Sequence, residues 1–459
     1  MSATQVAASI WDRQRLGITV GSVVLIFLAA IEALAVTTVM PIVSVDLDGE
    51  ALFAVAFSGT LATGVIGMVA AGAWSDRTGP RVPLYTAVVL FIIGLVVSGF
   101  APDMYTFIVG RLIQGLGAGG QTVALYVVVA RVYPPELHGR IFAAYAAAWV
   151  VPSMIGPFLA GAVAEFLHWR WAFLGVAVLT VLAFVLVMAR LRNVSLSSSD
   201  PTDEAAQTPR GGSIGVRMLR AVIVAVAAVA VGFAAEARPA IGWPIALGAL
   251  VVLGFAILPL LPPGALQARR GLPSVILMRG LAAGAFFAAE AYVPKLLMDR
   301  FEFSPTFAGL ALTIAALAWS SASALQGRYG DRLGSTRIVV ISVPLLLVAV
   351  LSILVVSVTG AMPWLAVIGW GFAGAGMGLL YPRLTVLTLA YSTSANEGFN
   401  SSALSISDST GSAVTIALAG LLFLALPFGG SGFPVVYVFT AVLLLVALIP
   451  GLRLGDGSR

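Results

Sequence analysis

The sequence GAWSDRTGPR, residues 72–81, places a short charged segment between two long apolar stretches, and GRYGDRLGSTR, residues 327–337, does the same later in the chain. Asp76 and Asp331 are 255 positions apart, and an arginine directly follows each of them. A charged segment that recurs in this way within an apolar chain predicts an internal repeat, with two halves of similar layout.

The composition indicates that lipid surrounds most of the chain. Of its 459 residues, 60% are hydrophobic and only 10% are charged, whereas soluble domains carry about 25% charged residues. The absence of cysteine excludes disulfides and thiolate metal sites. Two histidines are too few for a multi-histidine metal site, and the sequence has no P-loop for ATP. We therefore expect no metal and no cofactor.

Fourteen segments are long and apolar enough to cross a bilayer, because a membrane helix needs about 20 apolar residues. The longest polar break, residues 190–213, is rich in serine, proline and charge and is typical of an exposed linker. The predicted spans are 16–44, 52–74, 82–101, 104–131, 141–165, 170–190, 216–235, 242–261, 272–297, 304–326, 337–359, 363–387, 399–427 and 433–451.

Lysine and arginine predict how these spans are oriented. Of the 25 basic residues, nineteen fall at the termini and in loops after even-numbered spans, four in loops after odd-numbered spans, and two inside spans. Because basic residues concentrate in cytoplasmic loops, both termini are expected in the cytoplasm, and the net charge of +5 does not imply a nucleic-acid partner. The strong preference for arginine over lysine suggests a GC-rich bacterial genome and therefore the inner (cell) membrane.

Two further pairs of segments support the repeat. Residues 39–48 align with 292–301, and the glycine-rich residues 115–120 align with 374–378. Repeats of this kind are a transporter architecture, with the substrate site between the halves near mid-membrane. The expected divisions are an N-terminal six-helix bundle at 1–190, a cytoplasmic linker at 191–215, two inserted spans at 216–262 and a C-terminal six-helix bundle at 263–459.

Four motifs carry a resemblance to a known family. The segment 72–81 is similar to the loop signature of the major facilitator superfamily, and RLIQGLGAGG, residues 111–120, is similar to its fourth-helix signature. PSMIGPFLAG, residues 152–161, resembles the fifth-helix antiporter signature, and HWRWAFL, residues 168–174, resembles the segment that follows it in drug exporters. The chain thus resembles the fourteen-helix drug:proton antiporters.

This resemblance implies an all-α integral membrane fold of two six-helix bundles with two extra inserted helices. It also implies that Asp76 acts near the N-terminus of span 399–427 as a latch between the halves, and Asp331 against span 141–165. The implied gating-loop residues are Gly72, Asp76, Arg77, Gly79, Arg81, Gly327, Asp331, Arg332 and Gly334, and the implied fifth-helix motif is Gly156, Pro157 and Gly161. The alternative is a pair of solvated loops, with glycines that serve packing alone.

Ionisable residues inside the spans are the candidates for proton coupling, because each is costly there unless it is paired or functional. They are Glu32, Arg111, Glu290 and Asp408, of which Glu32 is the first choice as proton carrier; structural ion pairs are the alternative. Arg279 is close enough to a helix end to extend to the membrane surface. The candidate substrate-cavity residues are Gln114, Trp149, Phe287 and Trp370.

The predicted function is proton-coupled secondary transport, in which lipophilic drugs or metabolites are exported by proton antiport with alternating access. The proton gradient is the expected energy source, and the expected partners are an amphipathic or lipophilic small molecule, protons and the lipid bilayer. A monomer is expected, and multidrug efflux with antibiotic resistance is the expected cellular role. The alternatives are an exporter of lipid or siderophore-like molecules, a substrate:proton symporter and, more remotely, a membrane-embedded enzyme or sensor; we expect no enzyme.

Overall fold

The computed structural model shows an all-helical protein. It describes residues 10–12, 15–191, 214–234, 237, 239–392, 397–426, 428 and 430–455. Over these residues, fourteen helices are long and apolar enough to cross a membrane, and the only β-type pairing is an isolated bridge between Phe428 and Ser431. The predicted number of spans is therefore confirmed. The linker expected at 191–215 lies almost entirely outside the described residues.

The helices form two groups of six, joined by a pair of helices. The N-terminal group is α1 (Leu16–Asp46), α2 (Phe53–Thr78), α3 (Arg81–Gly99), α4 (Met104–Val132), α5 (Pro135–Phe166) and α6 (Trp171–Leu191), with a short 3₁₀ turn η1 (Glu50–Leu52) before α2. The joining pair is α7 (Ile214–Phe233) and α8 (Pro239–Ile257), followed by η3 (Leu258–Leu260). The C-terminal group is α9 (Leu272–Phe301), α10 (Pro305–Leu333), α11 (Ser335–Thr359), α12 (Pro363–Ala390), α13 (Glu397–Ala425) and α14 (Phe433–Gly451).

Several helices are longer than the apolar segments that predicted them. α5 begins at Pro135 rather than near residue 141, and α9 continues to Phe301 rather than ending near residue 297. Hydropathy detects only the part of a helix inside the hydrocarbon, whereas the backbone continues its hydrogen bonding into the interface. The count of basic residues placed Lys295 and Arg383 in loops, although both lie inside predicted spans. That placement is wrong, because Lys295 is buried in α9 and Arg383 is buried in α12.

Glycines at aligned positions pack in the same way in the two groups. In α4, Gly115 lies against the backbone of α2 and Gly117 against the backbone of α3. In α12, Gly374 lies against the backbone of α10 and Gly376 against that of α11. A Cβ at any of the four positions would overlap backbone atoms of the neighbouring helix. The glycine-rich segments therefore have equivalent packing roles, since small residues let membrane helices approach closely.

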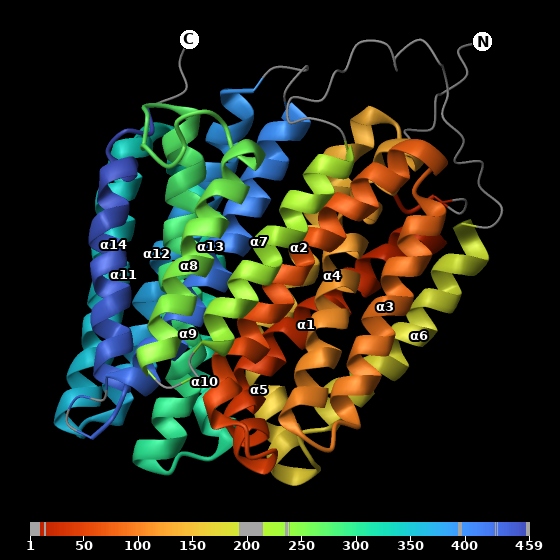
Figure 1. Ribbon diagram of the computed structural model, residues 1–459. Helices are drawn as coiled ribbons and strands as arrows, with labels where there is room; N and C mark the ends of the chain where they lie inside the picture. Colours follow the sequence, from red (N-terminus) through yellow and green to blue (C-terminus); the bar gives the residue numbers. More distant parts are fainter. Residues whose placement is uncertain are drawn as a thin grey trace, which may run out of the picture.

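The pair α7–α8 lies along the seam between the two groups. Figure 1 shows α1–α6 gathered on one side and α9–α14 on the other, with α7 in front between them and α8 beside α7, in front of the second group. α7 packs against both α2 and α13, and small apolar side chains of all three helices, among them Ala62, Ala225 and Ala413, share one buried cluster. The inserted helices thus cover one of the two lateral seams.

Candidate transport site

The N-terminal group encloses an ion pair formed by two predicted site residues. Glu32 lies at the middle of α1, and Arg111 lies in the second turn of α4. Arg111 donates from Nη1 to the Glu32 carboxylate and, over 2.7 Å, to Oε1 of Gln114; its Nε donates to the Ala56 carbonyl over 3.2 Å. Both charged side chains are only 5% exposed. The pair satisfies charges that could not otherwise remain in the bundle, and it ties α1, α2 and α4 together.

The C-terminal group holds a second ion pair, which the sequence did not predict. Arg279 of α9 donates from Nε to Oδ1 of Asp408 on α13 over 2.7 Å. The Tyr381 hydroxyl, on α12, donates to the same carboxylate oxygen over 2.7 Å, and the Arg279 guanidinium lies 3.4 Å from the centre of the Tyr381 ring. The expectation that Arg279 extends to the membrane surface is therefore wrong, because a carboxylate and an aromatic face hold it inside the bundle.

The two ion pairs differ in how much solvent reaches them. The side chains of Arg279 and Asp408 are 16% and 26% exposed, about three to five times as much as those of the other pair. Asp408 can therefore exchange its partner more readily than Glu32 in this conformation. The pairs are also placed differently in the two groups: the acid lies on the first helix in one and on the fifth in the other.

A row of aromatic rings leads to the second pair. Phe286 stacks on Trp370, with ring centres 5.3 Å apart, and lies edge-on to Trp319 at 5.4 Å. Trp319 in turn lies edge-on to Tyr381 at 5.2 Å. Glu290 follows Phe286 by one turn of α9 and is partly buried. The row thus joins α9, α10 and α12 and connects an apolar aromatic surface to the Arg279–Asp408 pair.

The four predicted cavity residues do not form one group. Phe287 and Trp370 both contact Phe286, while Gln114 belongs to the Arg111 network. Trp149, on α5, is 47% exposed and takes part in none of the ring contacts found in the described residues. In the described residues, Nε2 of Gln114 is buried without a hydrogen-bond partner, whereas the Trp370 indole faces the Glu290 carboxylate.

The two charged loops have the same backbone turn. Gly79 has φ 84° and ψ 164°, and Gly334 has φ 74° and ψ 161°. Residues other than glycine rarely adopt such positive φ values, so both positions favour glycine. These glycines are 255 residues apart, the same offset as Asp76 and Asp331, and the loops are therefore structurally equivalent.

Other gating-loop residues are described only in part. The carboxylates of Asp76 and Asp331 lie outside the described side chains, so the predicted latch contacts stay predictions. Arg81 donates to the Leu191 carbonyl at the end of α6 over 2.8 Å. Around Gly72 a Cβ would find only ordinary contact, so close helix packing does not require a glycine at this position. Arg77 and Arg332 are exposed, and Gly327 has open space around it.

The fifth-helix motif lies where the two groups meet. A Cβ at Gly161 of α5 would come 2.5 Å from the Pro305 carbonyl oxygen at the start of α10, and one at Gly309 of α10 would come 2.5 Å from the Pro157 carbonyl oxygen. Gly156, in contrast, has room for a side chain. The glycines at 161 and 309 therefore let α5 and α10 touch backbone to backbone on the predicted outer side.

The same side is also closed by polar contacts, which the sequence did not suggest. Glu165 of α5 accepts a hydrogen bond from the Thr306 hydroxyl, on α10, over 2.6 Å. Lys295, the single lysine of the chain, lies 2.9 Å from Asp299 on its own helix and 3.8 Å from Glu50 in the other group. Sequence reasoning missed these residues because they lie near predicted span ends, where charge is common. A lysine within an apolar segment was the one signal that could have found Lys295.

The segment 168–174 has a structural position at the end of α1. The indole of Trp169 donates to Oδ2 of Asp46 over 2.9 Å, and Arg170 donates to the same oxygen over 3.3 Å. Arg170 also donates to the Ala101 carbonyl over 2.8 Å. These bonds fix the start of α6 against the end of α1 and the loop before α4.

Two repeated helical groups around buried charged pairs are the architecture of a secondary transporter. The chain belongs to the major facilitator superfamily, whose family model matches residues 23–367 and again residues 275–456. The fold is similar to the crystal structure of a D-xylose-proton symporter, with a TM-score of 0.67 and 15% identity, over 96% of this chain and 98% of that one.

Two relatives are named as transporters. An uncharacterised MFS-type transporter of Mycobacterium tuberculosis is 32% identical over 34% of this chain, and an acurin A biosynthesis cluster MFS-type transporter of Aspergillus aculeatus is 27% identical over 52% of it. These matches span only 24% and 43% of the relatives' own lengths. The chain thus spans less than half the length of each of these relatives, one of which comes from a bacterium and the other from a fungus.

Proposed function

We propose that the protein exports lipophilic or amphipathic small molecules, drugs or metabolites, by proton antiport with alternating access of its two groups. The observation that supports this most is the partly exposed Arg279–Asp408 pair at the end of the aromatic row. The rings offer apolar contact to a substrate, and the carboxylate offers a charge for which a proton and a cationic substrate compete.

Competition for one carboxylate is sufficient to couple two fluxes. A carboxylate inside the spans needs either a cationic partner or a proton. When a proton binds Asp408, Arg279 loses its counter-ion and a cationic substrate loses its attraction. When the substrate binds instead, the proton is displaced. Proton and substrate then cross in opposite directions, and no other energy source or cofactor is needed.

The remaining predicted residues have secondary roles in this proposal. Glu32 is closed off by Arg111 in this conformation, so it takes part in coupling when the groups move and its surroundings change. Glu290 is the third candidate proton carrier and faces the Trp370 indole. The unpartnered Nε2 of Gln114 is a hydrogen-bond donor available to a substrate.

In this proposal the protein is a monomer that lies in the cell (inner) membrane, with both termini in the cytoplasm. It acts as a transporter and not as an enzyme. The relative from a biosynthesis cluster favours metabolite export as one role. Expression in a bacterial host that lacks its own pumps should raise resistance to lipophilic antibiotics. The arginine-rich composition favours a bacterial source.

Purified protein in liposomes tests the proposal. A pH gradient is imposed, a panel of lipophilic cations and neutral compounds is added, and substrate and proton movements are recorded together. Antiport predicts that substrate moves against the proton flux and that collapsing the gradient stops accumulation. Movement of both in the same direction would establish a symporter, and substrate movement without proton flux would exclude coupling. Phospholipid or iron-chelate probes in the same assay test export of lipid or siderophore-like molecules.

A further inference from the structure

α1 and α6 touch closely at their predicted cytoplasmic ends and separate further along. At Gly21 a Cβ would overlap the Val187 side chain, and at Gly17 it would lie 2.6 Å from Cγ of Arg190. These two glycines let the helices approach there. Beyond them, α1 carries the larger side chains of Val24, Phe27 and Leu28, so a groove opens between the helices.

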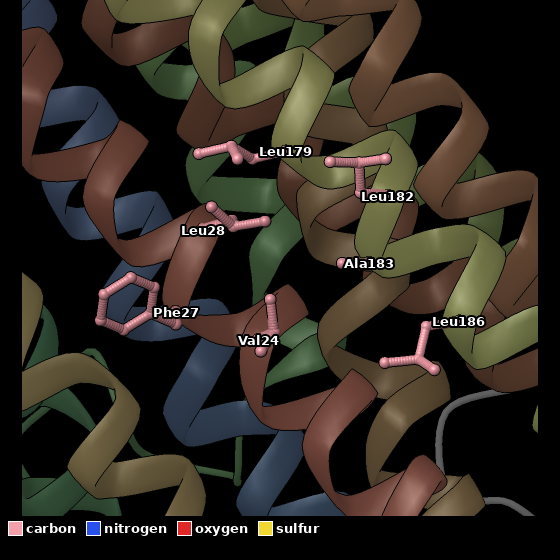
Figure 2. Close-up of a pocket in the computed structure, with 7 residues that line it drawn as sticks. All are labelled: Val24, Phe27, Leu28, Leu179, Leu182, Ala183 and Leu186. Atoms are coloured by element: carbon pink, nitrogen blue, oxygen red, sulfur yellow. The ribbon is translucent and has the colours of Figure 1, made fainter.

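This α1–α6 groove is apolar along its length. Figure 2 shows Val24, Phe27 and Leu28 on α1 opposite Leu179, Leu182 and Leu186 on α6. Leu182 is 63% exposed, so the groove faces outward from the bundle. In a membrane protein such an outward apolar surface meets lipid chains.

The distance from Arg190 to the far end of the groove matches the thickness of one lipid leaflet. Gly17 and Leu28 are eleven residues apart on α1, and Arg190 and Leu179 are eleven residues apart on α6. At about 1.5 Å per residue, each helix rises roughly 16 Å over this distance. One leaflet of hydrocarbon is about 15 Å thick. A phospholipid whose headgroup lies at Arg190 would therefore place one acyl chain in the groove, with the end of the chain near the bilayer centre.

Positive charge lies at the surface end of the groove. The stem of Arg190 passes over Gly17, and its side chain is exposed. Arg81 reaches the adjacent Leu191 carbonyl, and Arg15, at the start of α1, is paired with Asp12 over 3.0 Å. Arginine beside a bilayer surface attracts anionic headgroups, and a guanidinium binds phosphate oxygens well.

We propose that the α1–α6 groove binds one anionic phospholipid of the predicted cytoplasmic leaflet. One acyl chain lies along Phe27, Leu28 and Leu182, and the phosphate contacts Arg190. The site depends on the membrane fold alone, so it stands or fails independently of the substrate proposed above.

Native mass spectrometry of the purified protein tests this site. Protein stripped of lipid is titrated with phosphatidylglycerol or with phosphatidylcholine of the same chains, and retained lipid is counted. The wild-type protein should retain one phosphatidylglycerol at concentrations where phosphatidylcholine is not retained. Arg190→Gln should lower this retention at least fivefold, whereas Arg190→Lys should keep most of it.

A second set of variants tests the same site by filling the groove with a larger side chain. Leu182→Trp should also lower phosphatidylglycerol retention at least fivefold, because the indole occupies the chain's position. Val185→Trp is the matched control: Val185 lies on the same helix, is 51% exposed and is not part of the groove lining. Equal retention of the two lipids by wild-type protein, or unchanged retention in both Arg190→Gln and Leu182→Trp, would overturn the proposal.

Discussion

Arg111 illustrates what a single side chain must do inside a membrane bundle. It contacts Glu32, Gln114 and the Ala56 carbonyl at once. A buried guanidinium without such partners would carry a large desolvation cost. Its position is therefore determined by partners on three helices, and each partner also depends on it.

The first prediction concerns this pair. Removing one member of a buried ion pair typically costs about 3–5 kcal/mol, because the other charge is left uncompensated. Arg111→Gln should therefore lower the melting temperature clearly. Glu32→Gln should lower it less, since Arg111 keeps Gln114 and the Ala56 carbonyl as acceptors. Thermal unfolding in detergent, followed by tryptophan fluorescence, measures both.

The double variant Glu32→Gln/Arg111→Gln is the control for this prediction. It removes both charges and should melt closer to the wild-type protein than Arg111→Gln does. In liposomes, Glu32→Gln should also abolish pH-gradient-driven efflux but still bind neutral substrates if Glu32 carries the proton. A melting temperature unchanged in Arg111→Gln would contradict the importance of the pair for stability.

The second prediction separates charge from hydrogen bonding at Asp408. Asp408→Asn removes the charge for which proton and substrate compete, so driven efflux should fall at least about tenfold, or roughly 1.4 kcal/mol. Tyr381→Phe removes one hydrogen bond but keeps the ring beneath Arg279, so its effect should be smaller. Initial rates in liposomes under a fixed pH gradient measure both. Wild-type rates in Asp408→Asn would move the role to Glu32 or Glu290.

At the scale of elements, glycine positions decide which helices touch. α4 and α12 each present glycines to two neighbours, and α5 and α10 use Gly161 and Gly309 to meet across the two groups. The contact between α5 and α10 is the one that must change if the groups rock against each other. It is therefore expected to be more sensitive to added bulk than packing within one group.

The third prediction tests this contact with a matched pair of substitutions. Gly161→Ala would place a methyl group 2.5 Å from the Pro305 carbonyl oxygen, whereas Gly156→Ala adds the same methyl group 3.8 Å from Cβ of Leu34 on α1. Gly161→Ala should lower transport at least fivefold, and Gly156→Ala should stay near the wild-type rate. Equal rates in the two variants would show that the close contact has no role in transport.

Accessibility of the predicted outer side gives a second measure of the same prediction. If Gly161→Ala separates α5 from α10, a cysteine at Thr306 should react faster with an impermeant thiol reagent than it does in the Gly161 background. The chain has no native cysteine, so labelling is specific. No increase in reactivity would argue that the added methyl is accommodated without opening this side.

At the scale of the whole molecule, the even number of spans returns the chain to the side where it began. Basic residues at the ends of helices predict that this side is cytoplasmic, even though Lys295 and Arg383 lie inside helices rather than in loops. The orientation decides which side of the membrane the Arg279–Asp408 pair and the α5–α10 contact face. It is therefore the prediction on which the direction of transport depends.

The fourth prediction tests this orientation. A cysteine in place of the exposed Thr78, at the end of α2, should resist an impermeant thiol reagent in intact cells and react after permeabilisation. A cysteine in place of Ala361, between α11 and α12, should react in intact cells. The opposite pattern would reverse the predicted orientation.

The sequence alone predicted the number of spans, the resemblance to the major facilitator superfamily and the positions of the two equivalent loops. These features are local or periodic. Apolar length reports a membrane helix directly, and the glycines at 79 and 334 are needed by a turn that requires no distant partner. Glu32 and Arg111 were found because a charge inside an apolar segment is visible without knowing the fold.

Tertiary structure alone decided which side chains meet. Arg279 and Asp408 are 129 positions apart, and Glu165 and Thr306 are 141 positions apart, so their pairing depends on how each helix is rotated and where the helices cross. Hydropathy is nearly uniform around these helices and does not determine that rotation, because lipid and protein interior are both apolar. The α1–α6 groove has the same origin: two glycines are visible in the sequence, but only the packed helices show where close contact ends and an acyl-sized space begins.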